Sequence, residues 1–167
     1  MKNILIPTDF TDESVSILSD YLNSHPDEQV NVLFFHAIKL SDSITDLLLL
    51  SRRTKEQELI PEEFKNYCKN VRKEFDMIEN VRFQYFYGHT MALFRNFLEA
   101  NEINLIIYNP AVKLKRISKT SIDLAEIINK SNCEKWLGET ITRRLDDVEK
   151  EKVVEELPRE ESAATYL

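Results

Sequence analysis

The chain opens with a short apolar run, Ile4–Ile6, which ends at Pro7 and is followed by Thr8 and Asp9. A helical pattern begins directly afterwards, near Thr11. A strand buried on both faces that leads through a polar turn into a helix is typical of the start of a parallel α/β sheet. Such sheets bind ligands outside the carboxyl ends of their strands. We therefore expect Pro7, Thr8 and Asp9 to line a cleft.

Apolar runs and helical periods alternate along the next part of the chain. Three more clear strands are predicted, over Val30–Ile38, Val81–Tyr87 and Ile103–Tyr108. Helices are predicted over residues 11–23, 44–60, 61–78, 91–98 and 122–132. This alternation predicts an α/β fold, an open parallel sheet with helices on both faces and right-handed crossovers, as in Rossmann-like proteins. The strand at Val81–Tyr87 alternates apolar and polar residues, which favours a position at an edge of the sheet.

The composition excludes several classes of protein. A chain of 167 residues with 43% apolar residues is long and apolar enough for one domain with a proper core. The net charge of −7 argues against a nucleic-acid partner, because phosphate binding needs a basic face. Cys68 and Cys133 lie far apart and form no CxxC pair, so neither a metal site nor a disulfide framework is expected. No run approaches the roughly 20 apolar residues of a membrane span, and the N-terminus does not resemble a signal peptide. We expect a cytoplasmic protein that does not bind a membrane.

The C-terminal part of the chain has a different character. Residues 134–167 contain ten acidic and six basic residues, a net charge of −4. A thin apolar stripe that begins at Leu137 predicts a charged amphipathic helix as far as about Leu157, where Pro158 ends it. We therefore divide the chain into an α/β domain, residues 1–133, and a charged, helical extension, residues 134–167.

Four segments of the α/β domain match one family in order and spacing. They are KNILIPTDFTDES, VNVLFFHAI, Gly88 with the later INLIIYN, and ISKTSIDLAEIINKSNC. Together they resemble the universal stress protein (UspA-like) family. The resemblance implies a fold similar to adenine nucleotide alpha hydrolase-like domains, and a small cytoplasmic stress-response protein without enzymatic activity that forms a homodimer. It also implies that Pro7, Thr8, Asp9 and the backbone of Ala37 lie at an adenine-nucleotide site.

One departure from the family lies in the loop after the fourth strand. Nucleotide-binding members carry glycines there with the spacing G-x2-G-x9-G-[ST], so that backbone amides can approach phosphates. This chain reads NPAVKLKRISKTS and has no glycine in that segment. Asn109 and Val112 take the places of the first two glycines, and Ser121 stands near the last. The loop instead carries four cations within seven residues, at Lys113, Lys115, Arg116 and Lys119. They could hold an anion by their side chains, or they could form a solvated loop.

A second departure concerns the fifth strand, which in the family follows the last helix and commonly forms the dimer contact. After Cys133 the chain reads EKWLGETITRR, in which only Trp136 and Leu137 could serve as a remnant of that strand. We therefore treat the fifth strand as doubtful and the family's dimer mode as open.

Three residues allow a structural and a functional interpretation. Asp9 could bond an adenine or a ribose, or it could be a turn or helix-cap carboxylate. His36 at the end of the second strand favours a structural role, because the sequence identifies no partner for catalysis. Ser121, or its neighbour Thr120, is expected to cap the last helix.

Two hypotheses about function follow. The first is a non-enzymatic, universal stress protein-like protein with a lost or weakened ATP site, without an obligatory cofactor. It would act through protein contacts, as a homodimer or through a partner at its C-terminal helix. The alternative is an adenine-nucleotide-binding member, possessing at most weak hydrolysis, that holds ATP or AMP with the basic loop instead of a glycine loop. In both, the candidate binding residues are Pro7, Thr8, Asp9, Ala37, Asn109, Val112, Lys115 and Ser121, with no catalytic residue and no metal ligand.

Overall fold

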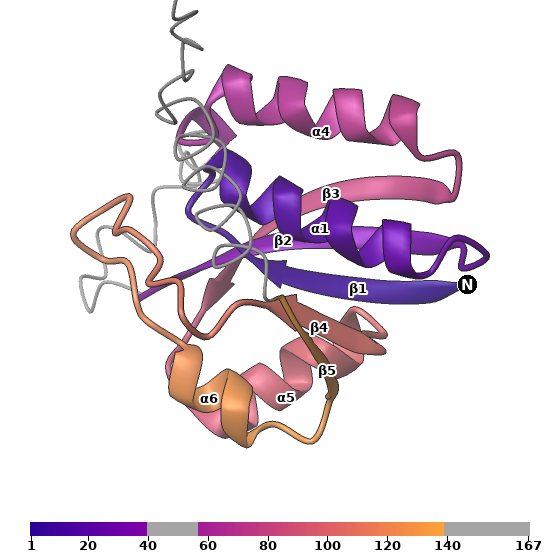
Figure 1. The fold of residues 1–167 in the computed structure, drawn as a ribbon. Coiled ribbons are helices and arrows are strands. Elements are labelled where there is room, and N and C mark those ends of the chain that lie inside the picture. The colour runs from indigo at the N-terminus through magenta and orange to yellow at the C-terminus, as the bar shows by residue number, and fades with distance from the viewer. Residues whose placement is uncertain (40–56, 139–167) are drawn as a thin grey trace, which may run out of the picture.

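The computed structural model describes residues 1–39 and 57–138, which form a five-stranded parallel sheet with helices on both faces (Figure 1). The strands run in the order β3-β2-β1-β4-β5. Their bounds are β1 Lys2–Pro7, β2 Val30–Ile38, β3 Ile78–Tyr87, β4 Leu105–Tyr108 and β5 Glu134–Leu137. The helices are α1 Asp12–Ser24, α4 Glu62–Glu74, α5 Met91–Ala100 and α6 Ala125–Lys130.

The alternation of side chains along the central strands builds one core on each face of the sheet. On one face, Ile4 and Ile6 of β1 pack with Phe34 of β2 beneath α1 and α4. On the other face, Leu5 and Phe35 pack beneath α5 and α6. Figure 1 shows α1 and α4 on one side of the sheet and α5 and α6 on the other. The Ile4–Ile6 part of β1 is buried on both faces and is therefore apolar without a break, which is the pattern that the sequence shows.

The predicted fold class is confirmed, and so is the edge position of the third strand. Among the described residues, β3 pairs only with β2, and Arg82 and Gln84 on it are exposed. The predicted helix over residues 122–132 is too long, since α6 covers only Ala125–Lys130. Ile122 belongs instead to the preceding loop, where its amide donates to the carbonyl oxygen of Ala37 (2.9 Å).

The doubtful fifth strand is present. β5 pairs in parallel with β4, with Trp136 opposite Ile107 and Leu137 opposite Tyr108. The sheet therefore continues past residue 133, and residues 134–137 belong to it. Most of the predicted helix at 44–60 and the predicted C-terminal helix beyond residue 138 lie outside the described residues. The charged extension therefore stays a prediction.

Candidate ligand site

The carboxyl ends of β1, β2 and β4 open into a cavity of about 950 Å³. The long loop between β4 and α6 forms one side of this cavity, and the first turns of α1 form another. Of the eight residues predicted for the site, seven line it: Pro7, Asp9, Ala37, Asn109, Val112, Lys115 and Ser121. Thr8 is not among the lining residues; its side chain is fully buried behind the wall.

The turn after β1 is fixed by its own side chains. The Thr8 hydroxyl accepts from the amide of Phe10 (2.8 Å) and shares a hydrogen bond with the Ser14 hydroxyl (2.7 Å). Phe10 adopts a positive φ of 61°, a conformation that is uncommon for a residue with a bulky side chain. Its ring packs against Phe64 and Tyr85 in the core, which holds the turn in this conformation.

Asp9 ties this turn to the basic loop. Its Oδ1 accepts from the amide of Thr11 (3.3 Å) and from the Thr11 hydroxyl (2.6 Å). Its Oδ2 accepts from the amide of Lys115, which is 106 residues away in the sequence (2.9 Å). Asp9 therefore acts as a turn carboxylate, and in addition it anchors the loop that carries the cations.

The loop between β4 and α6 satisfies many of its own amides. The amide of Ala111 donates to Asn109 Oδ1 (2.9 Å), and the amides of Ile117 and Ser118 donate to Ser121 Oγ (3.2 and 3.1 Å). The amide of Thr120 donates to the Ser118 hydroxyl (3.2 Å). Amides bonded in this way are not available to cradle a phosphate, so an anion here would be recognised chiefly by side chains.

Ser121 does not cap the last helix, contrary to the sequence-based prediction. Its hydroxyl lies 2.8 Å from Nε2 of His36, and the other ring nitrogen, Nδ1, lies 2.7 Å from the carbonyl oxygen of Thr8. A carbonyl oxygen can only accept, so Nδ1 carries the hydrogen and donates it to Thr8, and Nε2 of the neutral ring accepts a hydrogen bond from the Ser121 hydroxyl. Burial lowers the pKa of the His36 imidazole, although the Thr8 hydrogen bond and the Asp9 carboxylate oppose this effect.

The charge of the cavity differs in sign from that of the chain. Five cationic and three acidic side chains line it, a formal charge of +2, whereas the whole chain carries −7. The cations are Lys39, Lys113, Lys115, Arg116 and Lys119. None of the five forms an ion pair with another of the described residues. Arg116 donates instead to the carbonyl oxygens of Lys119 (3.1 Å) and Ser121 (3.3 Å).

Some lining residues were not among the predicted site residues. Lys39 follows the carboxyl end of β2, so the rule that selected Asp9 could also have selected it. Ser16 lies on α1, and its buried hydroxyl oxygen has no hydrogen-bond partner among the described residues. Asn129 on α6 accepts from the Tyr108 hydroxyl. The positions of Ser16 and Asn129 depend on how the helices pack, which no local motif indicates.

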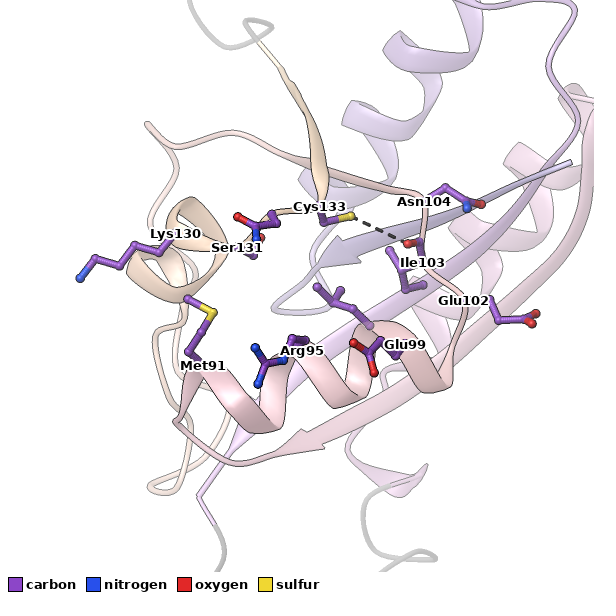
Figure 2. Close-up of a pocket in the computed structure, with 11 residues that line it drawn as sticks. Met91, Arg95, Glu99, Glu102, Ile103, Asn104, Lys130, Ser131 and Cys133 are labelled. Carbon is purple, nitrogen blue, oxygen red and sulfur yellow. Dashed lines mark hydrogen bonds between the residues drawn. The ribbon is translucent and has the colours of Figure 1, made fainter.

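A second cavity, of about 540 Å³, lies at the opposite edge of the sheet, beside the amino ends of β4 and β5 (Figure 2). Arg95 and Glu99 of α5 line one side, and Lys130 and Cys133 line the other. The Cys133 thiol donates a weak hydrogen bond to the carbonyl oxygen of Ile103 (4.0 Å), and burial raises the pKa of this thiol. None of the predicted site residues lies there.

The described residues offer neither a metal site nor a membrane-spanning helix. They contain no group of three or more His, Cys, Asp or Glu side chains arranged to hold a metal ion. Within residues 1–39 and 57–138, no helix is both long and apolar enough to span a membrane.

Comparison with known proteins relates the chain to solved structures. No family model and no curated protein sequence matches it. The hypothetical protein PH0823 is similar at 19% identity and a TM-score of 0.52, over 81% of this chain and 94% of that one. The universal stress protein UspA from Lactobacillus plantarum is similar at 14% identity and a TM-score of 0.48, over 81% and 96%. A universal stress protein family member from Burkholderia pseudomallei is similar at 8% identity and a TM-score of 0.48, over 82% and 95%. The first similarity supports the α/β fold, and universal stress proteins are among the structures that this chain is similar to.

Proposed function

We propose that this chain is a universal stress protein-like, non-enzymatic protein that binds an adenine nucleotide in the cavity at the carboxyl edge of its sheet. The observation that carries the proposal is the cationic cavity itself. Seven of the eight candidate binding residues line a space of about 950 Å³. Cavities of this size hold small-molecule ligands, and the phosphates of a nucleotide complement its positive charge.

The basic loop supplies the recognition that glycine amides give in other members. Val112 brings a β-branched side chain and Pro110 lacks an amide, so the backbone cannot act as a phosphate cradle at these positions. Lys113, Lys115 and Lys119 line the cavity without ion-pair partners among the described residues. Of the two sequence-based hypotheses, this geometry favours the nucleotide-binding one. Action through the C-terminal extension stays a prediction, because that segment lies outside the described residues.

A thermal-shift titration with ATP, ADP and AMP, with and without magnesium, tests the proposal. A ligand that binds the folded state at about 100 times its Kd stabilises the protein by about 2.7 kcal/mol. We expect the largest shift with ATP, since lysine side chains act on the total phosphate charge. The double variant Lys113→Ala/Lys119→Ala should weaken the response. The matched control Arg95→Ala/Lys130→Ala, which removes two cations from the other cavity, should leave it unchanged. No shift with any nucleotide at millimolar concentration would refute the proposal.

We also propose a homodimer that forms through β5. Within the part of the chain that the structure describes, this strand pairs only with β4, and Leu137 on it is 50% exposed. An edge strand with an exposed apolar side chain favours association with a second copy. Sedimentation of the full chain should show a dimer, and Leu137→Asp should convert it to a monomer. A monomeric full chain, or an unchanged dimer in the variant, would contradict this assignment.

A further inference from the structure

His36, Ser121 and the loop amides form one continuous hydrogen-bonded unit, which we call the latch. It runs from the Thr8 carbonyl oxygen through the His36 ring to the Ser121 hydroxyl, and from there to the amides of Ile117 and Ser118. His36 is 4% exposed and Ser121 is 7% exposed. The latch joins the end of β1, the end of β2 and the basic loop, which are far apart in the sequence.

Each atom of the latch has one role when the imidazole is neutral. Nδ1–H donates to Thr8, and Nε2 accepts from the Ser121 hydroxyl. The Ser121 oxygen uses its one hydrogen for His36 and its two lone pairs for the two loop amides. No capacity is left over at the hydroxyl. A proton added at Nε2 would place a second donor against it, and the oxygen would have to release at least one amide of the loop.

Few charged groups face the imidazole directly. Asp9 lies beside it at the end of β1, and its negative charge favours the protonated ring. Tyr85 of β3 meets the ring edge-on, with 6.4 Å between ring centroids. On the loop side, Arg116 donates to the Ser121 carbonyl oxygen (3.3 Å), which places a positive charge near the latch. Phe10 covers another side of the ring and carries no charge.

We propose that His36 is a positioning residue for the anion-binding loop, and that protonation of His36 weakens ligand binding in the cavity by opening the latch. This inference rests on the proposed nucleotide binding and adds a mode of regulation to the same site. The loop segment that the latch holds, residues 115–121, carries three of the five cavity cations: Lys115, Arg116 and Lys119. Loss of its amide contacts would let this segment shift, so the three cations would no longer be held around the same bound anion. The predicted weakening of anion binding is the opposite of what charge alone would give, since a positive imidazole would attract an anion.

The opposition between the two effects gives a sharp test. The probe is cyclic AMP, because its phosphodiester keeps a single negative charge over the pH range of the measurement. By calorimetry, we expect the affinity of the intact protein to fall about fivefold as the pH is lowered from about 7.5 to about 5.0, the equivalent of one net hydrogen bond. The range extends to this acidity because burial lowers the pKa of the His36 imidazole. His36→Gln should bind with an affinity independent of pH, because an amide side chain donates to Thr8 and accepts from Ser121 without titrating. Ser121→Ala should bind more weakly throughout. The control His89→Gln, which changes an exposed histidine outside the cavity, should behave like the parent protein.

A measurement without ligand separates the latch from the proposed function. In NMR spectra of the protein alone, the amide signals of Ile117 and Ser118 should titrate with the same midpoint as the His36 ring, and should stop doing so in His36→Gln. If the affinity is flat or rises towards acid, or if these amides do not follow His36, the latch proposal is wrong. If neither cyclic AMP nor ATP binds at any pH while the amides follow His36, the nucleotide proposal fails and the latch stands as a device of the loop alone.

Discussion

The two edges of the sheet carry similar charged side chains but use them differently. At the amino edge, Lys2, Tyr21 and Glu28 bond to one another: the Tyr21 hydroxyl donates to Glu28 Oε2 (2.5 Å), and Lys2 Nζ lies 3.2 Å from Glu28 Oε1. At the carboxyl edge, Asp9 instead accepts from the Lys115 amide of the distant loop between β4 and α6, Ser121 accepts from two amides within that same loop, and the lysines of the loop face a cavity. Charge that is satisfied locally stabilises the fold, whereas charge that is held in place without a partner remains available to a ligand.

The two cavities show the same contrast. The one at the amino edge is lined by equal numbers of cationic and acidic side chains, Arg95 and Lys130 against Glu99 and Glu102, whereas cations are in excess at the carboxyl edge. Lys130 is already paired with Glu126 (2.5 Å). The walls of this cavity come from α5 and from the turns beside α6, and no side chain predicted for ligand binding reaches it. A hollow becomes a candidate site only where strand ends and hydrogen bonds fix an excess of one charge around it.

Removal of the Asp9 carboxylate should have the largest effect on stability, because it removes the hydrogen bonds that hold the carboxyl edge together. Asp9→Ala leaves the amides of Lys115 and Thr11 and the Thr11 hydroxyl without their acceptor. Because hydrogen bonds to a charged group are worth more than neutral ones, we expect the free energy of unfolding to fall by about 2–4 kcal/mol. Urea denaturation at neutral pH measures this loss. Asp9→Asn, which keeps one carbonyl oxygen, should lose less.

Glu99→Ala is the matched control for Asp9, since it removes an exposed carboxylate from the amino-edge cavity. It should change the free energy of unfolding by less than about 0.5 kcal/mol. Equal losses for Asp9→Ala and Glu99→Ala would show that the carboxyl edge is not held by Asp9, and that the contrast between the edges is mistaken.

The sequence predicts this architecture well where burial is symmetrical. Ile4–Ile6 is apolar and Val30–Ile38 is largely apolar because both faces of β1 and β2 are covered. Such runs are typical of the inner strands of a parallel sheet. The family resemblance predicts Ala37 and Asn109 as site residues. The rule that ligands gather at carboxyl ends places Asp9 at the same cavity without any knowledge of side-chain geometry. Local pattern, general topology and the family resemblance are sufficient for this much of the candidate site.

The rest depends on contacts that no local pattern encodes. Ser121 looks like a helix cap, but its hydroxyl bonds to His36, 85 residues earlier, and the helix begins only at Ala125. β5 looks too polar to be a strand, because at the sheet edge only half of its surface needs to be covered; Lys135 and Trp136 are half-buried, and Glu134 and Leu137 are exposed. Long-range hydrogen bonds and edge strands are set by the assembled fold, and the sequence shows their donors and acceptors without showing their partners.

The smallest change in the free energy of unfolding is expected at the amino edge, and only at high pH. Burial, with the hydrogen bond to Glu28, raises the pKa of Tyr21 to about 12, from its ordinary value of 10.0. The folded state therefore holds this proton more tightly than the unfolded state. The stabilisation is complete below about pH 10 and is lost as the pH rises towards 12. Tyr21→Phe, which cannot ionise, should lack this loss.

Urea midpoints at several alkaline pH values measure the effect as a difference between the parent protein and Tyr21→Phe, so that the titration of the many lysines cancels. Glu28→Gln removes the negative charge beside the phenol, so it should reduce the alkaline loss, and the double variant should add nothing to the effect of Tyr21→Phe. If Glu28→Gln left the alkaline loss unchanged, burial alone would account for the pKa of Tyr21. The charges at the amino edge would then not act as a coupled group, and the difference between the two edges would depend on the carboxyl edge alone.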